Sequence, residues 1–337
     1  SPPEFSDELS GDSFFCAPAP PWVRGAGDIT AGNFFLISSA IVFPSLISHD
    51  EYYFYICSLI IKFLYAMNLK AKKWMFLLLC GCVMSLHAVR VDTLQVYSDK
   101  MKRDISVLVF VPDALEGKLP VLFLLHGYGE DETAWSRIAN LEQMADANRL
   151  LIVCPDGEKS WYWDSPMHPE LQFETFVSEE LPAYIDAHYP TYACREGRAV
   201  TGFSMGGHGA MWNAMRHPET FGAVGSTSGG LDIRPFPNNW QMKEQLGTIT
   251  EHPENWESHT VYNSLDAFLG TRTAIVIDCG YSDFFYKVNL DVHRRLRELN
   301  VKHDFYVRPG GHTGTYWSNS IHYQVLFFMN YFKQHLK

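Results

Sequence analysis

A serine set between glycines is the first feature of this chain whose residue types suggest chemistry. Residues 202–206 read G-F-S-M-G, which fits the pattern G-x-S-x-G. A strand-like run at 198–201 precedes the motif and a helix-like run follows it. In such a strand–turn–helix, small residues let the backbone turn sharply and lift the serine hydroxyl clear of a sheet. We therefore predict that Ser204 is a nucleophile; the alternative is a tight turn whose serine takes no part in a reaction.

The nucleophile requires a base. A serine hydroxyl attacks a carbonyl efficiently only when a neighbouring group accepts its proton. Among the histidines that follow Ser204, His312 lies in a glycine-rich loop directly after a strand-like run. His208 lies within the helix of the serine motif, and His293 and His322 fall in or beside helical patterns. We therefore predict that His312 is the base.

Two carboxylates between the serine and the histidine could orient the imidazole. Asp278 ends a strand-like run at 274–278, and Asp283 lies in the loop beyond it. We favour Asp283, because an acid in a loop can reach over the end of the sheet to the histidine. Its role would be to fix the imidazole tautomer and stabilise the imidazolium, without taking the proton.

Acyl transfer also requires hydrogen-bond donors for the oxygen on which negative charge develops. Residues 126–129 read H-G-Y-G and follow a short apolar run at 120–125. A loop in this place, together with the residue after the nucleophile, supplies backbone N–H groups for an oxyanion. We predict the N–H groups of Tyr128 and Met205 as these donors. No metal or organic cofactor is implied by such a mechanism.

The elements that must position these residues alternate along the chain. Strands are predicted at 94–97, 105–111, 120–125, 150–154, 198–202, 223–226, 274–278 and 303–307. Helices are predicted at 139–149, 173–189, 206–216, 288–299 and 323–336. Alternating strands and helices indicate an α/β domain, 89–337, with a mostly parallel central sheet and helices on both faces. Residues 229–268 are expected to shape the pocket, but their fold does not follow from the sequence.

The first 88 residues differ in character from this domain. From Met67, a basic start at 70–73, an apolar stretch at 74–86 and a small residue at 88 predict a signal peptide at 67–88. The stretch is shorter than the ~20 apolar residues of a membrane span, so we expect a secreted or periplasmic protein whose mature domain is not stably inserted. A lipobox-like run at 79–82 leaves a lipoprotein as an alternative.

Residues 1–66 are then expected to be a non-native or disordered extension, because a signal peptide should begin its chain. The alternative is a genuine membrane-associated extension, for which 53–66 is the best candidate. The charge of the whole chain of 337 residues excludes one further class of partner. Its formal net charge is −11, whereas a nucleic-acid surface requires a basic patch or stripe.

Four motifs together resemble a known family. The runs at 126–129, 202–207, 279–286 and 310–317 are similar to those of the esterase D-like group of α/β hydrolases. This group includes S-formylglutathione hydrolases, tributyrin-type acetyl esterases, feruloyl esterases and antigen 85 mycolyltransferases. The resemblance implies an α/β-hydrolase fold. It implies no metal or organic cofactor. Its residues fall on the triad Ser204, Asp283 and His312 and on the oxyanion donors Tyr128 and Met205.

The run W-Y-W-D at 161–164 looks most like the short-chain acetyl and feruloyl esterases of that group. We therefore expect a secreted serine carboxylic ester hydrolase that cleaves acetyl or feruloyl esters, with plant polysaccharide as the expected source. Trp161 and Trp163 are predicted to bind substrate; the alternative is that they pack beneath a long loop. An S-formylglutathione hydrolase-like thioesterase, an acyltransferase of the same fold, and a non-catalytic carbohydrate-binding protein remain as alternatives.

Overall fold

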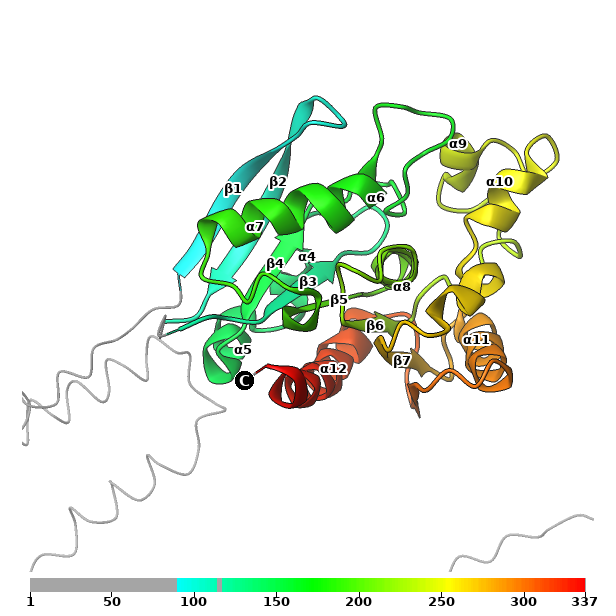
Figure 1. The fold of residues 1–337 in the computed structure, drawn as a ribbon. Coiled ribbons are helices and arrows are strands. Elements are labelled where there is room, and N and C mark those ends of the chain that lie inside the picture. Colours follow the sequence, from blue (N-terminus) through cyan, green and yellow to red (C-terminus); the bar gives the residue numbers. More distant parts are fainter. Residues whose placement is uncertain (1–89, 114–116, 337) are drawn as a thin grey trace, which may run out of the picture. The chain divides into compact units, whose positions relative to one another are not determined.

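The computed structural model describes residues 90–113 and 117–336, which form the fold shown in Figure 1. The predicted extension at 1–66 and the predicted signal peptide at 67–88 lie outside the described residues. All the motifs that could do chemistry lie within them.

The centre of the fold is an eight-stranded sheet with the strand order β1-β2-β4-β3-β5-β6-β7-β8. The β1–β2 and β2–β4 pairs are antiparallel, and all the other neighbouring pairs are parallel. The strands are β1 (Arg90–Ser98), β2 (Arg103–Val111), β3 (Val121–Leu125), β4 (Leu151–Pro155), β5 (Arg198–Gly202), β6 (Ala223–Thr227), β7 (Ala274–Gly280) and β8 (Asp304–Arg308). The predicted α/β fold with a mostly parallel sheet is confirmed.

Alternation along the central strands divides the core into two layers. In β3, every residue is buried; Val121, Phe123 and Leu125 belong to one hydrophobic cluster, and Leu122 and Leu124 to the other. Successive side chains of a strand point to opposite faces, so a strand covered on both sides reads as a continuous apolar run. This is why the run at 120–125 could be recognised in the sequence.

Helices cover both faces of the sheet. The helices are α4 (Ala134–Ile138), α5 (Leu141–Asn148), α6 (Phe173–Thr175), α7 (Leu181–His188), α8 (Met205–Arg216), α9 (Met242–Leu246), α10 (Pro253–Ser258), α11 (Tyr286–Glu298) and α12 (Gly314–His335). The structure also has a π-helical turn, η1 (Phe176–Glu180), and two 3₁₀ helices, η2 (Arg195–Gly197) and η3 (Val261–Phe268). The α7, α8 and α11 helices pack on one face, and α5 and α12 pack on the other (Figure 1).

Two predicted helices differ from the observed ones. The helix predicted at 173–189 is α6, the π-helical turn η1 and α7 in succession. The closing helix, predicted from 323, begins at Gly314, because the side chain of Thr313 accepts a hydrogen bond from the N–H of Tyr316 and caps it. Glycines at 310, 311 and 314 made this first part of the helix look like loop in the sequence.

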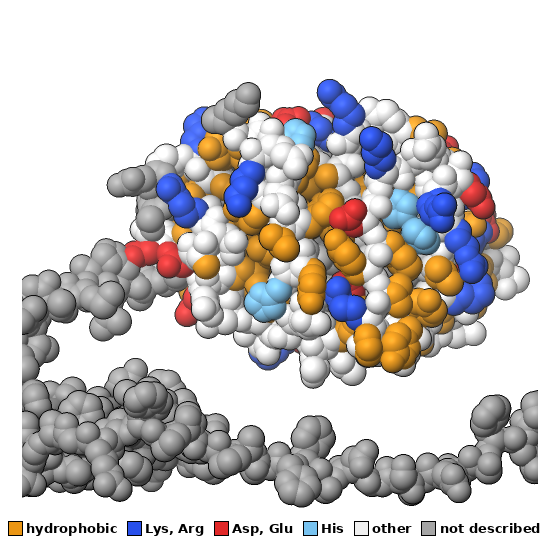
Figure 2. Space-filling model, turned by 90° about the horizontal axis from the view of Figure 1, so that it is seen from below, with side chains coloured by type: hydrophobic (Ala, Val, Ile, Leu, Met, Phe, Trp, Pro, Cys, Tyr) orange, Lys and Arg blue, Asp and Glu red, His pale blue; other side chains and the backbone are white. Residues whose placement is uncertain are grey.

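The face covered by α5 and α12 carries a groove between these two helices. Its volume is about 960 Å³, and its lining includes Leu141, Met144 and Leu326. Figure 2 looks onto this side of the molecule, where hydrophobic side chains gather between scattered Lys and Arg side chains. The residues with predicted chemistry are not among those that line it.

A buried carboxylate ties α6 to the helix that follows Ser204. Glu174 accepts hydrogen bonds from Trp212 Nε1 at 2.7 Å, Arg216 Nε at 2.6 Å and His217 Nε2 at 2.9 Å. Burial alone would raise the pKa of Glu174, but these donors outweigh it and hold that pKa below its usual value. Burial opposes the positive charge of His217, yet the hydrogen bond to Glu174 raises the pKa of His217.

The ion pair of Glu174 and His217 should make the stability of the fold depend on pH. The contribution of Glu174 is lost as the pH falls through its lowered pKa, below 4.5, and that of His217 is lost as the pH rises through its raised pKa, above 6.5. We therefore expect the pair to stabilise the fold most between about pH 4.5 and 6.5. Urea unfolding of residues 89–337 across pH 4–9 measures this. The variant His217→Gln should lose the decline on the alkaline side, and an unchanged profile in that variant would contradict the assignment.

Candidate active site

The serine of the G-x-S-x-G motif lies in a sharp turn between β5 and α8. Its backbone has φ +57° and ψ −117°, a region that residues with side chains seldom adopt. The turn is possible because the backbones around it approach closely. A Cβ atom at Gly202 would lie 2.4 Å from the carbonyl carbon of Gly206, and one at Gly206 would lie 2.2 Å from the carbonyl oxygen of Leu125. Only glycine fits at these two positions, which explains the motif.

The serine, histidine and loop acid form a continuous hydrogen-bonded chain. His312 Nε2 lies 2.9 Å from Ser204 Oγ, and His312 Nδ1 lies 3.0 Å from Asp283 Oδ2. The carboxylate of Asp283 is fully buried and also accepts a hydrogen bond of 2.8 Å from the N–H of Phe285. Since a carboxylate only accepts, Nδ1 of His312 carries the proton and Nε2 is free to accept the serine proton. The structure therefore brings together the three residues predicted for the triad.

The second carboxylate considered in the sequence, Asp278, has a different environment. Its side chain is fully buried and accepts hydrogen bonds from the hydroxyl of Tyr316 and the guanidinium of Arg308. Burial raises the pKa of Asp278, and these two donors act against that shift. Asp278 thus joins β7 to β8 and to α12, which are the elements on either side of the His312 loop.

The two predicted oxyanion donors are backbone N–H groups that have no hydrogen-bond acceptor within the described part of the chain. Among the described residues, neither the N–H of Tyr128 nor that of Met205 donates a hydrogen bond to another protein group. Met205 is the first residue of α8, where unpaired N–H groups and the helix dipole favour negative charge. Tyr128 lies in the loop after β3, the neighbour of β5 in the sheet. Both N–H groups are therefore free to bind a ligand oxygen.

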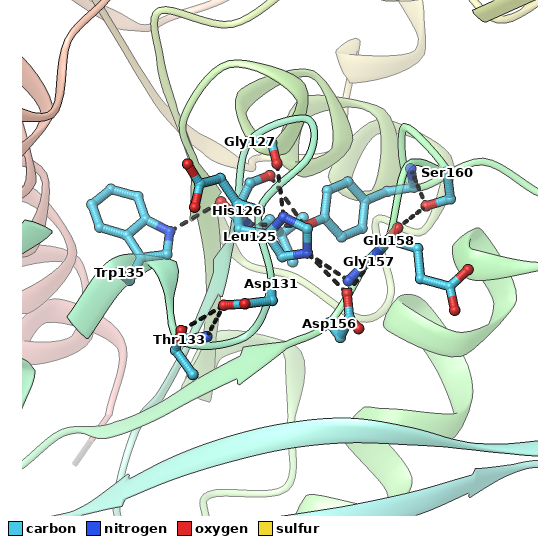
Figure 3. A network of polar contacts seen from close by, with 12 residues as sticks. Leu125, His126, Gly127, Asp131, Thr133, Trp135, Asp156, Gly157, Glu158 and Ser160 are labelled. Carbon is cyan, nitrogen blue, oxygen red and sulfur yellow. Dashed lines mark hydrogen bonds and ion pairs between the residues drawn. The ribbon is translucent and has the colours of Figure 1, made fainter. Parts of the chain in front are cut away.

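A buried histidine beneath this loop orients the peptide that carries the N–H of Tyr128 (Figure 3). The ring of His126 lies 2.8 Å through Nδ1 from the carbonyl oxygen of Gly127, and the N–H of Gly157 donates to its Nε2 at 2.7 Å. Because a carbonyl only accepts, Nδ1 is the donor. That carbonyl belongs to the same planar peptide as the N–H of Tyr128, so fixing one directs the other. The H-G-Y-G pattern marked the loop but did not reveal this role of His126.

The two tryptophans predicted to bind substrate lie in the core. Trp161 is 1% exposed and Trp163 is 0% exposed, and their rings stack with centroids 5.5 Å apart. Trp163 Nε1 donates to Nε2 of His208 at 2.8 Å, and burial lowers the pKa of His208 to about 3, which keeps that ring neutral. This arrangement corresponds to the packing alternative. Direct contact of either tryptophan with substrate finds no support in the position of its ring.

Other aromatic side chains lie beside His312 instead. The ring of Phe284 is 52% exposed and its centroid lies 4.3 Å from that of His312. Trp240 stacks on Phe284 at 5.7 Å, and Trp317 meets the edge of His312 at 5.0 Å. The sequence did not single out these three residues. Phe284 directly follows the predicted acid, a position that could have drawn attention to it.

The described residues add two negative observations. No group of three or more His, Cys, Asp or Glu side chains in 90–113 and 117–336 is arranged to hold a metal ion. In the same part of the chain, no helix combines the length and apolarity that a bilayer crossing requires.

The fold and the arrangement of Ser204 and His312 define an α/β hydrolase. Residues 98–328 match the Esterase family, and the chain belongs to it. An acetyl esterase from Caldicellulosiruptor saccharolyticus is 24% identical over 247 residues, which are 67% of this chain and 92% of that protein. These matches confirm the predicted carboxylic ester hydrolase and its resemblance to the esterase D-like group.

Solved structures agree with this membership. An S-formylglutathione hydrolase from Staphylococcus aureus superposes with a TM-score of 0.62 at 25% identity, covering 72% of this chain and 99% of that one. A ferulic acid esterase superposes with a TM-score of 0.60 at 26% identity, covering 73% of this chain and 99% of that one. The two neighbours carry the names of different ester hydrolases.

The different environments of the two carboxylates predict different consequences of the same substitution. We expect Asp283→Asn to lower kcat by about 10⁴, because the imidazole would lose its correct tautomer. We expect Asp278→Asn to lower the free energy of unfolding by about 1–3 kcal/mol, because a buried hydrogen-bonded group loses part of its partners, with little effect on kcat. Hydrolysis of para-nitrophenyl acetate and urea unfolding measure the two effects. A larger loss of kcat in Asp278→Asn than in Asp283→Asn would show that the acid is Asp278.

Proposed function

We propose that this esterase hydrolyses short-chain acyl (acetyl) esters or feruloyl esters of plant polysaccharides through an acyl-enzyme on Ser204. The observation that carries the proposal is the hydrogen-bonded chain from Ser204 through His312 to the buried carboxylate of Asp283. Two free N–H groups, on Tyr128 and Met205, accompany this chain. These parts together perform acyl transfer without requiring any further group.

In the first step, His312 Nε2 accepts the proton of Ser204 as the hydroxyl oxygen attacks the ester carbonyl. The carbonyl oxygen becomes an oxyanion, for which Tyr128 and Met205 supply N–H donors, each worth roughly 3 kcal/mol in the barrier. The imidazolium then gives its proton to the leaving alcohol. Water attacks the acyl-enzyme with the same base, which releases the acid and restores Ser204.

The substrate part of the proposal rests on the relatives and on the aromatic residues near His312. The acetyl esterase and the ferulic acid esterase act on the two acyl groups named. The half-exposed ring of Phe284, stacked with Trp240, offers a flat apolar surface beside the base. Such a surface suits a sugar ring or an aromatic acyl group. Secretion, through the predicted segment 67–88, would bring the enzyme to polysaccharide outside the cell.

A thioesterase of the S-formylglutathione hydrolase type is the second candidate, because one solved neighbour has that activity. An acyltransferase differs only in the last step, in which an alcohol replaces water. Comparing S-formylglutathione with para-nitrophenyl acetate tests the first. Adding a sugar acceptor and separating the products tests the second. A kcat/KM for the thioester more than about a hundredfold above that for oxygen esters would favour the thioesterase.

The role of His312 predicts the direction of the pH dependence. A protonated imidazole cannot accept the serine proton, so we expect kcat/KM to fall as the pH is lowered from 8 toward 5. Initial rates with para-nitrophenyl acetate in buffers of constant ionic strength measure this. A flat profile over that range would contradict a histidine base.

The natural substrate is tested with acetylated, feruloylated xylan and residues 89–337. We expect the unmutated protein to release acetate or ferulate, and Ser204→Ala to release neither, because the variant lacks the attacking oxygen. Chromatography of the released acids identifies the acyl group. Equal release by Ser204→Ala would overturn the nucleophile assignment. Cleavage of synthetic esters without release from xylan would leave the esterase but remove the polysaccharide from the proposal.

A further inference from the structure

Tyr128 carries one of the two candidate oxyanion N–H groups, and its side chain is hydrogen-bonded to a segment far away in the sequence. The hydroxyl of Tyr128 donates a hydrogen bond to the side-chain oxygen of Gln241, which lies 113 residues later. Gln241 precedes α9, in the segment between β6 and β7. Glycines flank Tyr128 on both sides and contribute no side chains, so the ring and hydroxyl of Tyr128 are its own anchor. Lys159 Nζ also lies 5.6 Å from the centre of the ring.

The acceptor itself is held in a fixed orientation. The amide of Gln241 donates through Nε2 to Glu244 Oε1 at 3.2 Å, which leaves its oxygen facing Tyr128. Trp240 and Gln241 both have positive φ, +49° and +52°, which is unfavourable for residues with side chains. Such backbone persists only where its surroundings impose it.

The same turn also contacts the other side of the site. The ring of Trp240 packs against Phe284 at 5.7 Å and Phe285 at 5.2 Å. Both of these phenylalanines contact the ring of His312, at 4.3 Å and 5.6 Å. The turn formed by Trp240 and Gln241 therefore contacts both the oxyanion loop, through Tyr128, and the loop of Asp283, through Phe284 and Phe285.

We propose that Gln241 is a positioning residue for the oxyanion donor. His126 fixes the peptide that carries the N–H of Tyr128, through the Gly127 carbonyl, and the hydrogen bond to Gln241 holds the side chain of Tyr128. With both constraints the N–H is oriented before the substrate arrives, so no reorganisation is needed when charge develops. This inference rests on the acyl-transfer function proposed above, but not on the identity of the natural ester.

The hydroxyl of Tyr128 has one competing role, as an oxyanion donor in its own right. Its hydrogen bond to Gln241 argues against that role, because a phenol has one proton to donate. The two roles predict different effects of substitution on kcat. If the hydroxyl bound the oxyanion, Tyr128→Phe would lower kcat and Gln241→Leu would not. If Gln241 positions the loop, kcat falls by the same factor in the two single variants and in the double variant, because each of them removes the same hydrogen bond.

The test is a double-mutant cycle with Tyr128→Phe and Gln241→Leu, using para-nitrophenyl acetate. We expect kcat to fall about five- to tenfold in each single variant and in the double variant, with KM changed by less than about twofold. The paired swap Gln241→Glu with Glu244→Gln keeps an acceptor facing Tyr128 and an amide donor beside it, and it should restore most of the rate. Lys243→Ala, on the exposed side of α9, is the matched control and should leave kcat unchanged.

A second readout separates positioning from a merely structural role. A boronic acid forms a tetrahedral adduct with a serine hydroxyl and so imitates the transition state. Its affinity should weaken in Gln241→Leu by the same factor as kcat/KM, while the melting temperature stays within about 2 °C of the unmutated protein.

Additive losses in the cycle, an unchanged kcat in Gln241→Leu, or a lowered melting temperature without weaker boronate binding would each overturn the inference. The synthetic ester keeps the two proposals separate. Failure on xylan with cleavage of para-nitrophenyl acetate counts only against the polysaccharide substrate, whereas an unimpaired Gln241→Leu counts only against the positioning role.

Discussion

The arrangement of the active site depends on one steric constraint, the close approach of two backbones where β3 and β5 end. The carbonyl oxygen of Leu125 occupies the space that a side chain at residue 206 would need. That oxygen also accepts hydrogen bonds from Trp135 Nε1 at 3.0 Å and from the N–H of Phe203 at 3.3 Å, so it cannot move aside. The contact brings the start of α8 against the end of β3. It thereby places the strained Ser204 and the loop of Tyr128, which belong to different strands, next to each other.

The two aspartates after β7 show how environment separates chemically identical groups. Asp283 faces the imidazole with its own loop N–H as a further donor, so its charge is available to a developing imidazolium. Asp278 lies five residues earlier. Its two oxygens accept hydrogen bonds from the guanidinium of Arg308 and the phenol of Tyr316, which links β7 to β8 and α12. One carboxylate is therefore placed to act on the imidazole of His312, and the other stabilises the fold by joining β7 to β8 and to α12.

Local patterns in the sequence were sufficient to predict the sheet and the three residues that the structure joins by hydrogen bonds. Ser204, Asp283 and His312 each follow a strand closely, and the strands are short apolar runs with clear ends. The remaining parts depend on contacts between distant segments. The turn at Trp240 and Gln241 has no periodicity and is held by residues such as Tyr128. The run at 161–164 leaves substrate binding and packing open for Trp161 and Trp163, because neither residue type nor a family motif distinguishes a covered ring from an exposed one.

The position of β8 has a consequence for how the protein loses activity when it is heated or denatured. This strand is one of the two edge strands of the sheet, pairs only with β7, and is the least buried of the parallel strands. His312 follows it, whereas Ser204 follows the central β5. Edge elements open with less free energy than the interior of a sheet. Fraying of β8 would thus carry His312 away from Ser204 while the rest of the sheet stays folded, so inactivation by heat or denaturant should precede global unfolding, and residual activity would underestimate the surviving fold.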